Sequence, residues 1–135
     1  MDTFGISLIK RHEGLRLKPY RCPSGKLTIG WGRNLEDRGI DELEAERLFD
    51  RDWHDAEDGA TTLVKNWNQL SQNRKSVLVD MVFQMGLEGV KKFQVTLFHI
   101  EKENFKVAAF HMRNSLWAKQ TPERAEEDAR LMEEG

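Results

Sequence analysis

Residues 11–33 read RHEGLRLKPYRCPSGKLTIGWGR. Two segments of this stretch, 15–20 and 27–31, have the composition of β-strands, and the segment between them contains a proline and a glycine that favour a tight reversal. The stretch therefore predicts a small antiparallel β-hairpin, which a short third strand around Asn34 and Leu35 extends.

Helical patterns lie on both sides of the hairpin. Before it, apolar residues recur on one helical face over 3–12, with Thr3 as the expected cap and Gly14 as the stop. After it, apolar periodicity and capping signals such as Asp41 with Glu44, Ser71, and Thr121 before Pro122 predict further helices. We expect these at 41–59, from 71 to a stop at Gly86, and at 93–101, 104–113 and 122–133. The fold class is therefore α+β, mainly helical, with a small N-terminal antiparallel sheet and a C-terminal helical lobe.

Composition limits the class of protein. The chain has 135 residues, a formal net charge of -2, 33% charged and 39% hydrophobic residues, which excludes a disordered or low-complexity chain. It lacks an apolar run of about 18 or more residues, so no stable membrane insertion is expected. Cys22 is the single cysteine, so no intramolecular disulfide forms and the apolar core must stabilise the fold.

The near-neutral total hides an uneven distribution of charge. Residues 10–33 hold seven basic residues and one acid, Glu13, whereas residues 34–58 hold eleven acids and three basic residues. Charge runs are usually solvated surface, but this one surrounds a single carboxylate. A nucleic-acid-binding module is disfavoured, because the chain is slightly acidic overall and its basic segment contains that carboxylate.

Three residues in the opening stretch suggest chemistry. Glu13 falls at the end of the predicted helix, where the negative end of the helix dipole disfavours an ionised carboxylate, and a general acid must be protonated. Cys22 and Thr28 lie on the two arms of the adjoining hairpin. A helix end beside a hairpin can bring all three residues to one cleft, although spacing alone does not establish that they meet.

The stretch resembles the active-site region of the phage-type lysozymes, the glycoside hydrolase family of the T-even phage lysozyme. The family pattern is a Glu, eight residues, an Asp or less often a Cys, five residues and a Thr, and Glu13, Cys22 and Thr28 meet it. The match continues in Met81-Val82-Phe83-Gln84-Met85-Gly86 and in Trp117-Ala118-Lys119-Gln120-Thr121-Pro122-Glu123-Arg124-Ala125. Residues 34–77 match weakly and are shorter than in larger relatives. The resemblance implies one lysozyme-like domain over 1–135, with a smaller lobe at about 12–58 and a helical lobe from about 60 to 135 onto which helix 3–12 packs.

The resemblance also implies an activity and roles for residues. The expected reaction is hydrolysis of the β-1,4 bond between N-acetylmuramic acid and N-acetylglucosamine in bacterial peptidoglycan. Glu13 would protonate the leaving oxygen, Thr28 would hold the attacking water, and Arg124 would pair with Glu13. An inverting reaction needs carboxyl groups about 6.5–9.5 Å apart to leave room for that water. Four residues fall where the family lines its saccharide cleft: Asn34, Phe83, Gln84 and His111.

Cys22 is the departure from the usual Asp. An ordinary thiol is only a few per cent ionised at neutral pH, so it is a poorer base than Asp unless its pKa is depressed. Four basic neighbours are expected to depress it: Lys18, Arg21, Lys26 and Arg33. The thiolate would then orient water or attack the anomeric carbon, and the second route would retain stereochemistry. The alternative without a chemical role is that Cys22 packs in the core as a small hydrophobic residue.

Two competing functions stay open. With no second carboxylate, Glu13 alone can act as acid and then base in a lytic transglycosylase that forms a 1,6-anhydro product. A lysozyme-like module that has lost its base can instead bind glycan without cleaving it. We expect a monomeric endolysin of a phage or prophage that accumulates in the host bacterial cytoplasm until it is released to the wall, because no signal peptide is seen.

The remaining aromatic and titratable residues have simpler interpretations. We expect the four tryptophans, Met81 and Met85 to be mainly core, although tryptophans can also stack on sugars. The four histidines show no metal-ligand spacing, so no metal and no cofactor are expected.

Overall fold

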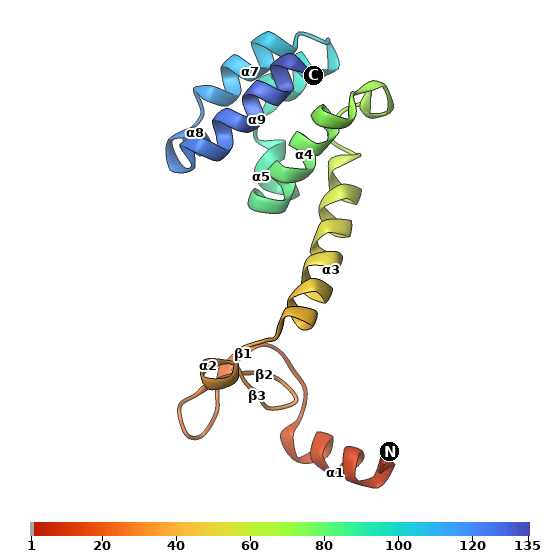
Figure 1. Cartoon of the computed structure of the whole chain (residues 1–135), viewed down its shortest axis with the longest axis vertical. Coiled ribbons are helices and arrows are strands. Elements are labelled where there is room, and N and C mark those ends of the chain that lie inside the picture. Colours follow the sequence, from red (N-terminus) through yellow and green to blue (C-terminus); the bar gives the residue numbers. More distant parts are fainter. Residues whose placement is uncertain (1) are drawn as a thin grey trace. The chain divides into compact units, whose positions relative to one another are not determined.

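The computed structural model describes residues 2–135 and divides the chain into two compact units (Figure 1). The N-terminal unit, Met1–Arg47, contains α1, the sheet and α2, and the C-terminal unit, Leu48–Gly135, contains helices α4 to α9. Helix α3 (Glu42–Ala60) passes through the boundary between them. The expected α+β, mainly helical fold class is confirmed.

Helix α1 (Thr3–Glu13) brings the candidate acid to a helix end. Gly14 ends the helix as predicted, with a φ of 72° and its N–H donated to the carbonyl of Lys10. The predicted cap, Thr3, is wrong: the carboxylate of Asp2 accepts the N–H of Gly5 at 3.0 Å. Aspartate is as good a cap as threonine. Because Asp2 lies one residue earlier in the chain, Thr3 becomes the first residue of the helix.

The sheet has three antiparallel strands in the order β1-β2-β3, as the opening stretch predicts. Their bounds are β1 Arg16–Arg21, β2 Leu27–Gly30 and β3 Arg33–Asn34. Tyr20 and Asn34 face Thr28 from the two sides, so Thr28 lies in the central strand. Leu35 is not part of β3 but begins α2 (Leu35–Arg38), which was not predicted.

Helix α3 begins with the predicted capping box. The carboxylate of Asp41 accepts the N–H of Glu44 at 2.8 Å, and the carboxylate of Glu44 accepts the N–H of Asp41 at 3.1 Å. Glu44 also pairs with Arg33 at 2.6 Å, and the hydrogen bond from that guanidinium lowers the pKa of Glu44 to about 2. These contacts connect the end of the sheet to the first turn of α3.

The C-terminal unit is a helical bundle around an apolar core. Its elements are 3₁₀ helix η1 (Trp67–Gln69), α4 (Gln72–Met85), α5 (Leu87–Lys91), α6 (Gln94–Glu101), α7 (Phe105–Arg113), α8 (Leu116–Gln120) and α9 (Pro122–Glu134). Helix α9 packs against α4, α7 and α8, as the upper part of Figure 1 shows. The largest fully buried side chains include Leu78, Met81, Ile100, Met112 and Met132.

All four helices expected in this unit are present, and the differences concern one cap and two short helices. Ser71 caps α4, and Pro122 occupies the first position of α9. The hydroxyl of Thr121 does not cap α9 but donates to the carbonyl of Trp117 at 3.1 Å. Helices α5 and α8 were not predicted. Within residues 2–135, no helix is long and apolar enough to cross a membrane.

Candidate active site

The carboxylate of Glu13 lies against the turn between β2 and β3. A Cβ on Gly32 would lie 2.5 Å from Oε2 of Glu13, so only glycine leaves room for this carboxylate. The φ of Gly32 is 76°, in the left-handed region that also favours glycine. The missing side chain and the positive φ of Gly32 therefore allow Glu13 to lie beside the sheet. Glu13 itself stays exposed to solvent.

We expect Gly32→Ala to lower wall-clearing activity by about 10- to 100-fold, because the new methyl group displaces the carboxylate by roughly an ångström. The matched control is Gly39→Ala, where φ is also positive at 63° but no atom lies near the new Cβ. Both variants place a Cβ at a positive φ, and circular dichroism and thermal melts measure the effect of each on the fold. Equal activity in the two variants would contradict a role for the Glu13–Gly32 contact.

Cys22 lies in the turn that joins β1 and β2. Its N–H donates to the carbonyl of Lys26 at 3.0 Å, and its carbonyl accepts the N–H of Gly25 at 2.8 Å. Sγ lies 3.1 Å from Oγ of Ser24 and remains partly exposed. The buried-hydrophobe interpretation of Cys22 therefore does not fit its surroundings, since both the turn and the thiol are polar and accessible.

Hydrogen bonds lower the pKa of the Cys22 thiol to about 7. The hydroxyl of Ser24 has the largest effect, and a backbone hydrogen bond from Lys26 comes next. A large fraction of Cys22 is therefore thiolate at neutral pH. The direction matches the sequence prediction, but the predicted cause, a cluster of positive charges, is wrong.

Three of the four basic side chains that were expected to act on Cys22 have carboxylate partners of their own. Arg21 pairs with Glu36 at 2.8 Å, and Lys26 with Asp37 at 3.3 Å. Arg33 is held by Glu44, as described above. The acidic segment that follows the hairpin thus neutralises much of the basic segment before it.

Thr28 is buried, with 3% of its surface exposed. Its hydroxyl donates to the carbonyl of Lys26 at 2.8 Å, which is the residue whose backbone also contacts Cys22. The structure therefore brings Thr28 and Cys22 together. Because its proton is already donated, the Thr28 oxygen is left to accept a hydrogen bond, for example from water.

The side chain of Asn34 caps helix α2 in the N-terminal unit. Its Oδ1 accepts the N–H of Asp37 at 3.0 Å and caps α2, and its Nδ2 donates to the Asp37 carboxylate at 3.0 Å. Both ends of the amide are thus used locally. Saccharide binding by Asn34 stays a prediction.

The other predicted cleft residues belong to the C-terminal unit. Phe83 packs against Phe49 with ring centroids 5.6 Å apart. Oε1 of Gln84 accepts a hydrogen bond from Nε1 of Trp117 at 2.8 Å. His111 stacks on His99 with centroids 5.9 Å apart. None of these contacts tests their predicted role, but each fixes the orientation of a ring or an amide.

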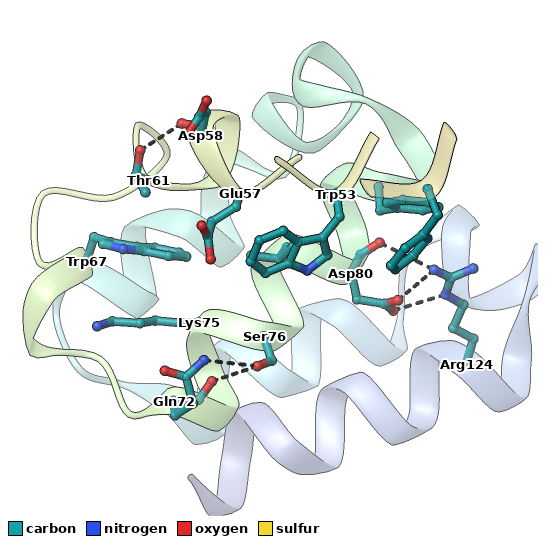
Figure 2. Close-up of a pocket in the computed structure, with 13 residues that line it drawn as sticks. Trp53, Glu57, Asp58, Thr61, Trp67, Gln72, Lys75, Ser76, Asp80 and Arg124 are labelled. Atoms are coloured by element: carbon teal, nitrogen blue, oxygen red, sulfur yellow. Dashed lines mark hydrogen bonds and ion pairs between the residues drawn. The ribbon is translucent and has the colours of Figure 1, made fainter. Parts of the chain in front are cut away.

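Two pockets of the C-terminal unit are lined by Phe83 and by His111. Phe83 and Arg124 line a pocket of about 570 Å³ whose walls include Trp53 and Trp67 (Figure 2). His111 lines a second pocket of about 550 Å³ with Phe93 and Trp117. Aromatic walls with a few charged or polar groups are typical of small-molecule sites.

The tryptophans correct one expectation. Only Trp117 is buried in the core among the residues that the structure describes, with 4% of its surface exposed. Trp31 is exposed and lies under the ammonium of Lys10, 4.2 Å from the ring centroid. Trp67 packs, partly buried, against the core, and both Trp53 and Trp67 line the pocket of Figure 2. Met81 is core, as predicted, and Met85 packs partly buried against it.

Arg124 has a carboxylate partner in its own unit. Its Nε and Nη2 donate to the two carboxylate oxygens of Asp80 at 3.0 and 2.6 Å, a bidentate pair drawn in Figure 2. This contact raises the pKa of Arg124. The pairing of Arg124 with Glu13 stays a prediction.

Sequence reasoning missed several residues that the structure ties to the site. Ser24 acts on Cys22, Gly32 positions Glu13, and Asp80 holds Arg124. The glycine was visible inside the quoted stretch, and the serine stands two residues after the cysteine, a spacing common in turns. Among residues 2–135, no group of three or more His, Cys, Asp or Glu side chains is placed to hold a metal ion.

Comparison with known proteins decides the family. A family model described as Phage lysozyme matches residues 10–127, which include Glu13, Cys22, Thr28 and Arg124. The chain belongs to the phage lysozyme family. It is therefore a glycosidase-type enzyme of the lysozyme kind, with peptidoglycan as its substrate.

Relatives come from several sources. "Probable T4-type lysozyme 2" of Dictyostelium discoideum is 30% identical over 157 aligned positions, which cover 95% of this chain and 92% of that protein. "Endolysin" of Bacillus phage B103 is 36% identical over 111 positions, covering 78% of this chain and 41% of that protein. "Pre-baseplate central spike protein Gp5" of Enterobacteria phage T4 is 30% identical over 146 positions, covering 87% of this chain and 25% of that protein.

Proposed function

We propose that this phage-type lysozyme is a muramidase that hydrolyses the β-1,4 bond between N-acetylmuramic acid and N-acetylglucosamine. The observation that carries the proposal is the position of Glu13, an exposed carboxyl group held against a turn that only glycine permits. A carboxyl group that is exposed to solvent beside Gly32 is accessible to a polymeric substrate, as a proton donor must be.

Glu13 is the general acid of this reaction. It transfers its proton to the glycosidic oxygen as the bond between that oxygen and the anomeric carbon breaks. The leaving sugar departs with a neutral hydroxyl group. Glu13 ends the step as a carboxylate and takes a proton from solvent before the next turnover.

Cys22 and Thr28 act on the water in this proposal. The thiolate, available at neutral pH, accepts one proton of the water as its oxygen bonds to the anomeric carbon, and Cys22 releases that proton to solvent before the next turnover. The Thr28 oxygen accepts the other proton of that water as a hydrogen bond. Attack from the face opposite the leaving group inverts the configuration.

Arg124 and the cleft residues have supporting roles. The family resemblance implies that Arg124 supports the general acid, and its guanidinium has donors that Asp80 does not use. Asn34, Phe83, Gln84 and His111 are proposed to contact the glycan. A relative named endolysin also supports a role in lysing a host cell from within.

Muropeptide analysis tests the proposed reaction against its transglycosylase alternative. Purified walls are digested with the protein, and the released fragments are analysed by mass spectrometry. We expect fragments with reducing ends, which carry one added water. Fragments with 1,6-anhydro ends, lighter by one water, would contradict hydrolysis, and absence of fragments would support the non-catalytic glycan-binding alternative.

A further inference from the structure

A buried aspartate lies on the apolar face of α9. Asp128 has only 6% of its surface exposed, and it follows the spacing of Ala125, Ala129 and Met132, which are fully or almost fully buried. No hydrogen-bond donor of the described residues reaches its buried Oδ2. An ionised carboxylate without donors is costly in such surroundings.

Asp80 faces Asp128 from α4. Helices α4 and α9 pack against each other, and Arg124, one turn before Asp128 on α9, binds the Asp80 carboxylate, which brings the two carboxyl groups near each other. Two ionised carboxylates at close range repel each other, which favours a proton on one of them. Arg124 binds both oxygens of Asp80, which keeps Asp80 ionised and leaves the proton on Asp128.

The other charged groups near Asp128 do not supply a substitute partner. Glu127, its neighbour on α9, adds negative charge and favours the protonated form. On α7, Arg113 is occupied by Glu126 at 2.9 Å and by Glu133 at 3.5 Å. Arg124 attracts Asp128 but donates its hydrogen bonds to Asp80.

We propose that Asp128 is protonated at neutral pH and donates a hydrogen bond to Asp80, so that this acid pair joins α9 to α4 through a link that alkaline pH removes. Burial and the contact with Asp80 raise the pKa of Asp128 to about 8. Burial opposes ionisation of Asp80 too, but the hydrogen bond from Arg124 lowers its pKa. Loss of the proton also places a second negative charge beside Arg124.

The link makes stability depend on pH in a defined direction. Because the pKa of Asp128 is raised, the folded chain holds a proton between about pH 4 and pH 8 that the unfolded chain has lost. The contribution of Asp128 to stability is therefore complete below about pH 4, falls through this window and levels off above it. Asp80, with a lowered pKa, loses its contribution only as pH falls below the ordinary aspartate range.

A carboxyl titration of the full chain tests the proposal directly. The ¹³C signals of the aspartate side chains are followed by NMR from pH 4 to pH 10. We expect Asp128 to titrate near pH 8, and to titrate at lower pH in Asp80→Asn, where the neighbouring charge is absent. Titration of wild-type Asp128 near pH 4 would overturn the proposal.

Thermal unfolding gives a second measurement. We expect the melting temperature of the wild type to fall by about 10 °C between pH 5 and pH 9, and that of Asp128→Asn to change far less, because the amide donates to Asp80 at both pH values. Glu123→Gln, which removes an exposed acid of the same helix that does not act on Asp128, should keep the wild-type fall. An equal fall in Asp128→Asn and the wild type would contradict the proposal, and the NMR titration decides if that variant does not fold.

Discussion

Replacement of Glu13 by glutamine is expected to lower the rate of wall clearing by about 10²–10⁴-fold, the usual contribution of a general acid. Glutamine has the shape of glutamate and keeps the contact with Gly32, but it has no proton to transfer at neutral pH. The measurement is the fall in turbidity of a suspension of purified walls, with product release as a second readout.

The control for this loss is Glu46→Gln, which changes the same functional group at an exposed position of α3 in the same unit. It should clear walls at the wild-type rate. Both variants should melt at temperatures close to that of the wild type, since neither side chain is buried. Activity of Glu13→Gln within about threefold of the control would remove Glu13 from the chemistry.

The second large effect is expected at Cys22. In Cys22→Ser the hydroxyl stays protonated at neutral pH, so the base is lost and clearing should fall by about 10²-fold. In Cys22→Asp the carboxylate restores a base, and activity within about tenfold of the wild type is expected. Full activity of the serine variant would contradict a chemical role for the thiol.

Ser24→Ala tests the ionisation of Cys22 without changing Cys22 itself. Loss of the Ser24 hydroxyl removes the largest cause of the lowered pKa of Cys22 and leaves the cysteine in place. The rate of alkylation of the single cysteine should then rise with pH at more alkaline values than in the wild type, where the pKa is about 7. An unchanged alkylation profile would show that another group sets the ionisation of Cys22.

Much of the fold follows from local signals in the sequence. Gly14 ends α1, Ser71 and Gly86 begin and end α4, and the capping box of Asp41 and Glu44 is present. These devices act within four residues, so the sequence displays them completely. Helices α2, α5 and α8 were missed because four or five residues do not show a helical period.

The candidate site was less predictable where contacts span the chain. A basic segment around Cys22 favours ionisation by charge, yet Arg21, Lys26 and Arg33 are paired with acids more than ten residues away. The hydrogen bond of Ser24 then has the largest effect. In the same way, the spacing of α9 places Asp128 on an apolar face, but only the folded bundle brings Asp80 beside it.

The most direct test of the central claim is the anomeric configuration of the product. Soluble glycan chains from peptidoglycan are cleaved with the protein, and the first reducing ends are observed by ¹H NMR before they mutarotate. Attack by water on the face opposite the leaving group predicts the α anomer at the new reducing end. Initial formation of the β anomer would contradict it and indicate a covalent intermediate on Cys22.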